Sequence, residues 1–222
     1  MVKNSFDPEI DYIPAEISDY LAVNLTDRQT DQLTAYLRLL VKWNKSVNLV
    51  SRKNVESVLK DRLFDAMLIW REVRIWNGLT HLDIGSGAGF PAIPIHVMAP
   101  ESKLLMVDSR AKRVAFLSAV AAELSVPNIE IRQDRVDLGR NADISGRRFD
   151  IVTAQAVTDI DKIVPIAISS LADNGRYVTV VAADSGNLRE PRFKKEDIYV
   201  TETAHTRPDG KQCKILQIMS QR

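Results

Sequence analysis

The segment Thr80–Pro91 constrains the fold of this chain more than any other stretch. It begins with an apolar run and continues through three glycines at alternate positions, Gly85, Gly87 and Gly89, into a segment of helical character. Glycine lets a chain turn sharply off a parallel strand and lets a ligand approach the backbone closely. A second apolar run ends at Asp108, about 20 residues further on, where a carboxylate can accept hydrogen bonds from ribose hydroxyls. The two runs predict a βαβ unit that binds a nucleotide-like ligand.

The spacing of the glycines distinguishes between two classes of ligand. A dinucleotide site requires G-x-G-x-x-G, whose last glycine would fall at Phe90. The chain instead has Asp83 followed by alternate glycines, a D-x-G-x-G-x-G form that resembles motif I of class I S-adenosylmethionine (AdoMet) methyltransferases. AdoMet carries an amino-acid end and a sulfonium in place of a pyrophosphate, and we expect Asp83 to help orient them. NAD binding is the alternative, which cofactor selectivity would test.

The pattern of apolar residues predicts a helical region followed by an α/β domain. Thr26 and Gln29 have the spacing of a capping box, and an amphipathic stripe follows them. A second helix is expected over residues 55–70. Strands are expected at 81–85, 103–108, 128–133, 149–155 and 175–183, with helices at 91–99, 110–125 and 159–171. We expect residues 1–78 to form an N-terminal helical extension and residues 79–222 to form one AdoMet-binding domain.

The C-terminal part of the chain predicts a β-hairpin. Two strand-like runs, 198–206 and 212–219, flank Pro208-Asp209-Gly210, which strongly favours a turn. Residues 173–175, Asp-Asn-Gly, are expected to form the turn into the last parallel strand. The expected fold is therefore the α/β, Rossmann-like fold of class I methyltransferases, with a seven-stranded, mostly parallel sheet that ends in an antiparallel hairpin.

Composition and charge exclude several functional classes. The net charge is +1 over 222 residues, so any contact with nucleic acid has to come from a local patch. The single cysteine, Cys213, cannot form an intramolecular disulfide, which fits a reducing cytoplasm. The acidic N-terminal residues are unlike a signal peptide, and no apolar run is long enough to span a membrane. The histidines lack metal-ligand spacing, so we expect no metal. Together with the preceding features, we expect a cytoplasmic protein without membrane contact.

Several stretches together resemble the RsmG family of bacterial 16S ribosomal RNA guanine-N7 methyltransferases, also called glucose-inhibited division protein B. The resembling stretches are Trp-Asn-Lys-Ser-Val-Asn-Leu at 43–49, Gly-Ser-Gly-Ala-Gly-Phe-Pro-Ala-Ile-Pro at 85–94, and shorter matches at 62–67, 108–117 and 149–153. The resemblance implies AdoMet as cofactor and 16S ribosomal RNA, or the small ribosomal subunit, as substrate. The cofactor residues that it implies are Asp83, Gly85, Gly87, Gly89, Phe90, Asp108, Val136, Asp137 and Gln155.

Candidate substrate residues rest on charge and position. They are Lys45, Arg52, Asp65, Lys112 and Arg113. For the basic residues the alternative is an ordinary solvated surface. Asp65 lies on an otherwise apolar helix, where it either caps a nearby loop or shapes the cofactor pocket.

The chain departs from the family pattern on the side that would face RNA. After the fourth strand the family has Ser-Arg-Ala, whereas this chain has Ala-Gln-Ala with Gln155 at the centre, which removes a positive charge. Arg62 stands where the family usually has histidine, although Asp65 is kept. Two alternatives therefore stay open: an AdoMet-dependent methyltransferase of a small molecule or a protein, and a non-catalytic AdoMet-binding protein of ribosome assembly.

Methylation of guanine at ring nitrogen 7 requires no general base. The transfer is an in-line displacement that depends on positioning, and this nitrogen has a free lone pair and no proton. Other base methylations should leave traces in the sequence. A pyrimidine C5 enzyme needs a cysteine nucleophile, but Cys213 lies in the terminal hairpin, away from the strand ends. Amino-group methylation usually goes with an Asn/Asp-Pro-Pro-aromatic segment after the fourth strand, which is absent here.

Overall fold

One twisted sheet organises the computed structural model, which describes residues 7–73, 78–136, 146–155, 160–184 and 198–220. Within these residues seven strands pair in the order β3-β2-β1-β4-β5-β7-β6. Their bounds are Thr80–Ile84 (β1), Lys103–Asp108 (β2), Ile129–Gln133 (β3), Phe149–Thr153 (β4), Leu171–Ala182 (β5), Ile198–Thr206 (β6) and Gln212–Ser220 (β7). The first five strands pair in parallel, and β7 runs antiparallel to both β5 and β6. The predicted fold class is confirmed.

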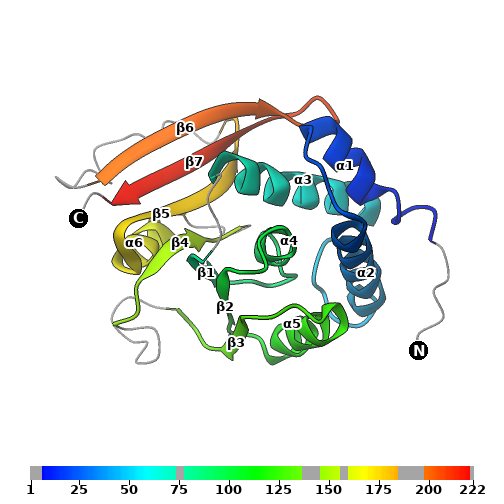
Figure 1. The fold of residues 1–222 in the computed structure, drawn as a ribbon, viewed down its shortest axis with the longest axis horizontal. Coiled ribbons are helices and arrows are strands. Elements are labelled where there is room, and N and C mark those ends of the chain that lie inside the picture. The colour runs from blue at the N-terminus through cyan, green and yellow to red at the C-terminus, as the bar shows by residue number, and fades with distance from the viewer. Residues whose placement is uncertain (1–6, 74–77, 137–145, 156–159, 185–197, 221–222) are drawn as a thin grey trace.

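Helices cover both faces of the sheet. Figure 1 shows α6 on one side and α2, α3, α4 and α5 on the other. The bounds are Ile13–Leu21 (α1), Asp27–Asn44 (α2), Val55–Val73 (α3), Ala92–Met98 (α4), Ala111–Leu124 (α5) and Ile160–Ser169 (α6). Among the described residues, no helix is both long and apolar enough to cross a lipid bilayer.

Two apolar cores form because neighbouring residues of a strand point to opposite faces. In β2, Leu104 and Met106 face the core under α1–α5, whereas Leu105 and Val107 face the core under α6. Strand β2 is consequently apolar from Leu104 to Val107, as expected for a parallel strand that is covered on both sides. Helices α1–α3 share the first core with α4 and α5, so the N-terminal helices are packed onto the sheet.

The predicted capping box is present at the start of α2. Thr26 Oγ1 accepts a hydrogen bond from the Gln29 amide at 3.3 Å, and Gln29 Oε1 accepts one from the Thr26 amide at 2.9 Å. The predicted hairpin is present as well. The turn between β6 and β7 closes through hydrogen bonds from the Arg207 amide to the Lys211 carbonyl (2.8 Å) and from the Gly210 amide to the Arg207 carbonyl (2.9 Å).

Strand β5 begins earlier than the sequence predicts. Residues 173–175 lie inside β5, and not in a turn before it, because the strand starts at Leu171 and α6 ends at Ser169. The pairing with β4 shifts at this point, from Phe149–Leu171 to Ile151–Arg176, so the extra residues form a bulge. A Cβ at Gly175 would lie 2.8 Å from the Phe149 carbonyl oxygen, so only glycine fits this close approach. The turn-like sequence is accommodated as an irregularity of the strand.

Candidate functional site

The loop that follows β1 is shaped by its own glycines and by the neighbouring strand. The amides of Gly85 and Ser86 both donate hydrogen bonds to the carbonyl oxygen of Val107 in β2, at 2.8 and 3.0 Å. Gly85, Gly87 and Gly89 have positive φ angles of 71°, 54° and 91°, which residues with a Cβ rarely adopt. The backbone path of the loop therefore requires the alternate glycines of the motif.

Asp108, at the carboxyl end of β2, ties this loop to the next helix. Its Oδ2 accepts a hydrogen bond from the Gly87 amide and its Oδ1 accepts one from the Arg110 amide, both at 2.9 Å. The guanidinium of Arg113 lies against the same carboxylate, with Nη1 3.5 Å from Oδ2. Asp108 is buried, so it is Arg113 that lines the cavity beside the loop.

Helix α2 supports the loop from beneath through Tyr36. The buried hydroxyl of Tyr36 donates a hydrogen bond to the Ala88 carbonyl at 2.7 Å, and its ring contacts the edge of Phe90 with the centroids 5.2 Å apart. A Cβ at Gly89 would lie 2.9 Å from Ile93 Cγ1 and 3.3 Å from the Tyr36 hydroxyl oxygen. The N-terminal helical region thus helps to build the glycine loop.

Asp83 lies beneath the loop in a fully buried chain of polar groups. The Thr153 hydroxyl donates a hydrogen bond to Asp83 Oδ1 at 2.6 Å, and His81 Nε2 lies 2.8 Å from the same hydroxyl. A hydroxyl has one proton to donate, so His81 Nε2 must be the donor to Thr153. Burial raises the pKa of Asp83 to about 7 and lowers the pKa of His81 to about 3. Asp83 Oδ2 is also buried and has no hydrogen-bond partner among the described residues.

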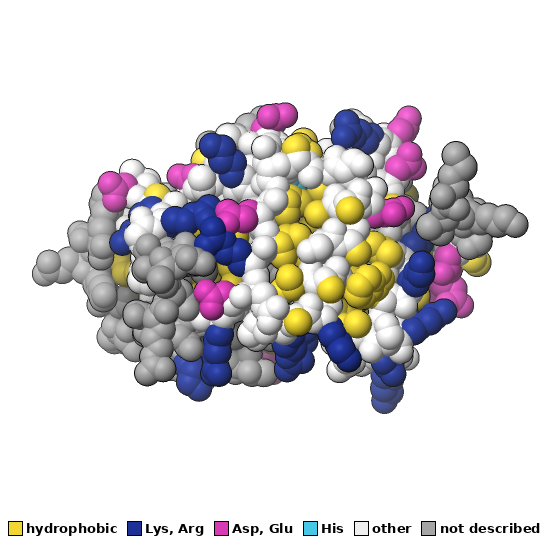
Figure 2. Space-filling model, turned by 90° about the horizontal axis from the view of Figure 1, so that it is seen from below, with side chains coloured by type: hydrophobic (Ala, Val, Ile, Leu, Met, Phe, Trp, Pro, Cys, Tyr) yellow, Lys and Arg dark blue, Asp and Glu magenta, His cyan; other side chains and the backbone are white. Residues whose placement is uncertain are grey.

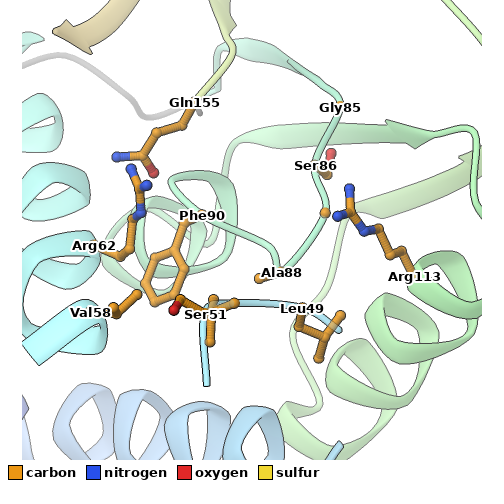
Figure 3. A pocket seen from close by; sticks show the side chains of 12 residues that line it. Leu49, Ser51, Val58, Arg62, Gly85, Ser86, Ala88, Phe90, Arg113 and Gln155 are labelled. Carbon is orange, nitrogen blue, oxygen red and sulfur yellow. The ribbon is translucent and has the colours of Figure 1, made fainter. Parts of the chain in front are cut away.

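A cavity of about 380 Å³ opens beside the glycine loop. One wall is the loop itself, and α5 contributes Arg113. Figure 3 shows Arg113 on one side of the cavity and Gln155 and Arg62 on the other, with Phe90 between Arg62 and the loop. The lining residues are Leu49, Val50, Ser51, Val58, Arg62, Gly85, Ser86, Gly87, Ala88, Phe90, Arg113 and Gln155. The cavity lies at the carboxyl ends of β1 and β4, where the strand order reverses and α/β sheets commonly bind ligands.

A buried carboxylate joins three distant segments at one end of this cavity. Asp65 of α3 is 1% exposed and accepts hydrogen bonds from Arg207 Nη2 at both oxygens, at 2.7 and 2.9 Å, and from Arg207 Nε at 3.2 Å. Gln155 Nε2 donates to Asp65 Oδ2 at 2.9 Å. Burial raises the pKa of Asp65 to about 6, although Arg207 and Arg62 act to lower it. Arg207 comes from the hairpin turn, so the C-terminal strands take part in this site.

Position 155 carries no charge, yet positive charge is present around it. Arg207 pairs with the carboxylate that Gln155 contacts, and Arg62 lines the same cavity with its Nη1 4.0 Å from Asp65 Oδ2. The arginine that the family pattern places at 155 is thus absent from the strand end, but two arginines from α3 and the hairpin surround this position. The cavity wall therefore keeps positive charge although residue 155 is a glutamine.

The other predicted site residues are more scattered. Lys45 and Lys112 are exposed and do not line the cavity. Arg52 donates hydrogen bonds to the carbonyls of Asn44 and Lys45 at 3.2 and 3.0 Å, which fastens the end of α2. Val136 packs against the core under α6. The remaining predicted residue, Asp137, lies outside the described residues.

Sequence reasoning missed four residues of the site: Tyr36, Arg62, Thr153 and Arg207. Tyr36 reads as part of an apolar stripe and Thr153 as part of a strand, so neither suggests a polar contact. Arg62 precedes Asp65 by three positions, which places both on one helix face, and it stands where the family usually has histidine. Arg207 lies in a turn, and no local pattern predicts where a turn will pack.

Comparison with known proteins identifies relatives across most of the chain. The GidB family model, described as rRNA small subunit methyltransferase G, matches residues 29–207. Ribosomal RNA small subunit methyltransferase G of Streptococcus agalactiae serotype V is 37% identical over 163 residues, which cover 72% of this chain and 68% of the relative. The protein of the same name from Staphylococcus haemolyticus is 32% identical over 186 residues, covering 83% of this chain and 76% of the relative.

Solved structures with low sequence identity share the fold. A ribosomal protein L11 methylase from Lactobacillus delbrueckii subsp. bulgaricus superposes with a TM-score of 0.58 at 19% identity, covering 73% of this chain and 80% of that protein. A SAM dependent methyltransferase from Aquifex aeolicus gives a TM-score of 0.55 at 16% identity, covering 82% and 98%. These likenesses support the class I architecture of the sheet and its hairpin.

Proposed function

The chain belongs to the GidB family of rRNA small subunit methyltransferase G, and on that premise we propose that it transfers a methyl group from AdoMet to ring nitrogen 7 of a guanine in 16S ribosomal RNA. The observation that carries the proposal is the joint geometry of the glycine loop, Asp108 and the adjoining cavity. Because the match extends through most of the chain, it does not favour the two alternatives, a small-molecule or protein methyltransferase and a non-catalytic binding protein.

The residues at the cavity fit AdoMet. The volume of the cavity, about 380 Å³, lies within the range of pockets that hold small cofactors. We assign Gly85, Gly87, Gly89 and Phe90 to the methionine side, and Asp108 to the ribose hydroxyls, which reach it when the Arg113 guanidinium turns aside. Asp83 lies below the loop and holds β4 through Thr153, and we assign it to orienting the methionine side from there. Val136 and Asp137 would flank the adenine.

The chemistry requires positioning and no proton transfer. Bound AdoMet supplies an electrophilic methyl group on its sulfonium. The protein has to hold the guanine so that the lone pair of nitrogen 7 lies in line with this methyl group, and it has to exclude water from the gap between them. Gln155 follows β4, and Arg62 of α3 lies beside it at the cavity, where an acceptor can approach the cofactor site. No residue of the cavity is needed as a general base.

Contacts with RNA would come from local positive charge. The net charge of the chain is only +1. On the face drawn in Figure 2, however, Lys and Arg side chains follow the lower edge while most acidic side chains lie above it. We propose that exposed cations such as Lys45 and Lys112 contact phosphates, and that Arg113 and Arg62 act inside the cavity.

The proposal is tested by methyl transfer from labelled AdoMet to small ribosomal subunits from a strain that lacks this protein. We expect label in 7-methylguanosine of 16S RNA, identified by mass after digestion. Subunits from the parent strain, already methylated, are the control and should accept no label. Micromolar AdoMet binding without any labelled 7-methylguanosine would refute the proposed reaction.

A further inference from the structure

The side-chain amide of Gln155 uses its nitrogen in a hydrogen bond, whereas its oxygen has no partner among the described residues. Its Nε2 donates to Asp65 Oδ2 at 2.9 Å, whereas its Oε1 is buried and accepts no hydrogen bond from any described residue. An ionised carboxylate can only accept hydrogen bonds, so Asp65 fixes the polarity of the amide, with nitrogen toward α3 and oxygen away from it. Figure 3 shows this amide and the guanidinium of Arg62 pointing toward one another at one end of the cavity.

Arg62 has donors to spare because Asp65 already has a closer counterion. Arg207 donates to both carboxylate oxygens, whereas Arg62 Nη1 stays 4.0 Å from Oδ2. Within the described part of the chain, the Arg62 side chain donates no hydrogen bond, and about a third of it is exposed. Beside the partly exposed guanidinium of Arg62, the buried Gln155 Oε1 therefore stands without a donor, which is costly unless a ligand supplies one.

The position of this pair points to the methyl acceptor. Arg113 of α5 lies on the opposite side of the cavity, against Asp108, which ends β2 at the position that suits a ribose. Gln155 follows β4, the strand on the other side of β1. A ligand group at Gln155 and Arg62 is therefore at the far end of the cavity from the nucleoside of AdoMet.

We propose that Gln155 and Arg62 recognise the base edge of the target guanine, with Asp65 and Arg207 as positioning residues. The inference rests on the proposed function. Guanine O6 accepts from Arg62, and guanine N1–H donates to Gln155 Oε1. Nitrogen 7 lies on the other side of O6 and stays free for the methyl group. Adenine also has nitrogen 7, but it presents a donor at position 6 and an acceptor at N1, the reverse polarity. The pair therefore selects guanine.

The first test replaces Gln155 by methionine, which keeps the length and unbranched shape of the side chain and removes the amide. The substrates are small subunits with guanine or adenine at the methylated position. We expect wild-type protein to methylate guanine at least about 100-fold faster than adenine, and Gln155→Met to methylate guanine about 10- to 100-fold more slowly, with AdoMet affinity within about twofold of wild type. Arg62→Met should behave in the same way.

The control variant is Arg28→Gln, which removes an exposed arginine from the first turn of α2. It should leave both rates unchanged. Wild-type rates in Gln155→Met would overturn the inference. A loss of AdoMet affinity that parallels the loss of rate would overturn it as well, because the Gln155 amide would then contact the cofactor. Failure of the wild-type protein to form 7-methylguanosine would instead refute the proposed function.

The second test measures how Asp65 and Arg207 position the amide. The groups facing Asp65 are Arg62 and Asp61 from α3, Gln155 from the segment after β4, and Arg207 and Cys213 from the hairpin. Burial raises the pKa of Asp65 to about 6, and Arg207 opposes that rise. Arg207→Gln should therefore raise the pKa of Asp65 further and move the acidic limb of kcat/KM to higher pH. Once protonated, Asp65 no longer fixes the orientation of the Gln155 amide. Arg207→Lys should restore the limb in part. A lower Tm with an unmoved limb would show that Arg207 has only a structural role.

Discussion

Asp108 builds the glycine loop, and we propose that the same carboxylate binds the ribose of AdoMet. Its two oxygens accept hydrogen bonds from the amides of Gly87 and Arg110, and these bonds fix the glycine loop against α5. Each carboxylate oxygen has further lone-pair positions, and Arg113 now covers one of them. Ribose hydroxyls would use the remaining acceptor capacity. The two backbone hydrogen bonds would thus hold the carboxylate in position before a ribose binds.

We expect Asp108→Ala to weaken AdoMet binding by about 2–4 kcal/mol, because charge-assisted hydrogen bonds to the ribose are lost. Isothermal calorimetry on the purified variant measures the change, and circular dichroism verifies that it is folded. Glu101→Gln, an exposed carboxylate at the opposite end of β2, is the matched control. An unchanged affinity in Asp108→Ala would show that the ribose assignment is wrong.

Asp83 should give the stability of the protein a measurable pH dependence. Its pKa is raised to about 7 in the folded state, so the folded protein binds a proton that the unfolded chain releases near pH 4. The free energy of unfolding should therefore fall as the pH rises from about 4 to 7. Asp83→Asn removes this dependence, and the difference between variant and wild type should change by up to about 4 kcal/mol across that range.

Urea unfolding at several pH values between 4 and 8 measures this difference. Titration of Asp65 also contributes to the pH dependence, but it is common to both proteins and cancels in the comparison. His81 belongs to the same hydrogen-bonded chain as Asp83, so its titration is part of the measured difference. Parallel stability curves for wild type and Asp83→Asn would contradict the raised pKa of Asp83.

At the scale of elements, α2 serves both stability and the site. Its start is fixed by the capping box of Thr26 and Gln29, and its middle places Tyr36 under the glycine loop. The contact between Thr26 and Gln29 is local and lies at the surface. The hydrogen bond from Tyr36 to Ala88 is buried and joins residues 52 positions apart. Two substitutions in one helix therefore separate helix stability from loop support.

Tyr36→Phe should lower the free energy of unfolding by about 1–3 kcal/mol, because the buried Ala88 carbonyl loses its donor. It should also weaken AdoMet binding, since the loop is held less firmly. Thr26→Ala should cost about 1 kcal/mol of stability and leave AdoMet affinity unchanged. Thermal unfolding and calorimetry on both variants distinguish the two effects. Equal AdoMet affinity in the two variants would show that Tyr36 does not support the site.

At the scale of the whole molecule, segments that are far apart in the sequence meet at the cavity. The α2–α3 loop supplies residues 49–51 of the wall, α3 supplies residues 58 and 62, the segment after β1 supplies the glycine loop, and the hairpin turn supplies Arg207. Positive charge is local, since the overall charge is close to neutral. RNA affinity should therefore depend on a few exposed cations.

We expect binding to 16S RNA to weaken steeply with salt, and Lys45→Gln or Lys112→Gln each to reduce the slope of log K against log[salt] by about 1. AdoMet affinity should be unchanged in both variants, because neither residue lines the cavity. Lys103→Gln, at the amino end of β2, is the control and should keep the wild-type slope. A wild-type slope in both test variants would place the RNA elsewhere on the surface.

Local sequence was sufficient for most elements. The capping box, the alternate glycines and the Pro208-Asp209-Gly210 turn each depend on a few neighbouring residues, and all three appear where they were predicted. The start of β5 was wrong because a bulge depends on the partner strand, here on the approach of Gly175 to Phe149. A turn-like sequence can thus be drawn into a strand when the neighbouring strand provides the pairing.

By itself the sequence determined the α/β order, the path of the glycine loop and the hairpin, because backbone constraints and apolar periodicity act over short distances. Only the tertiary structure decided that Arg207 and Gln155 meet Asp65, across 142 and 90 residues. Likewise, only packing placed Tyr36 beneath Ala88 and enclosed Asp83 below the loop. Contacts of this kind depend on how whole elements pack against one another, and no local pattern of residues encodes that packing.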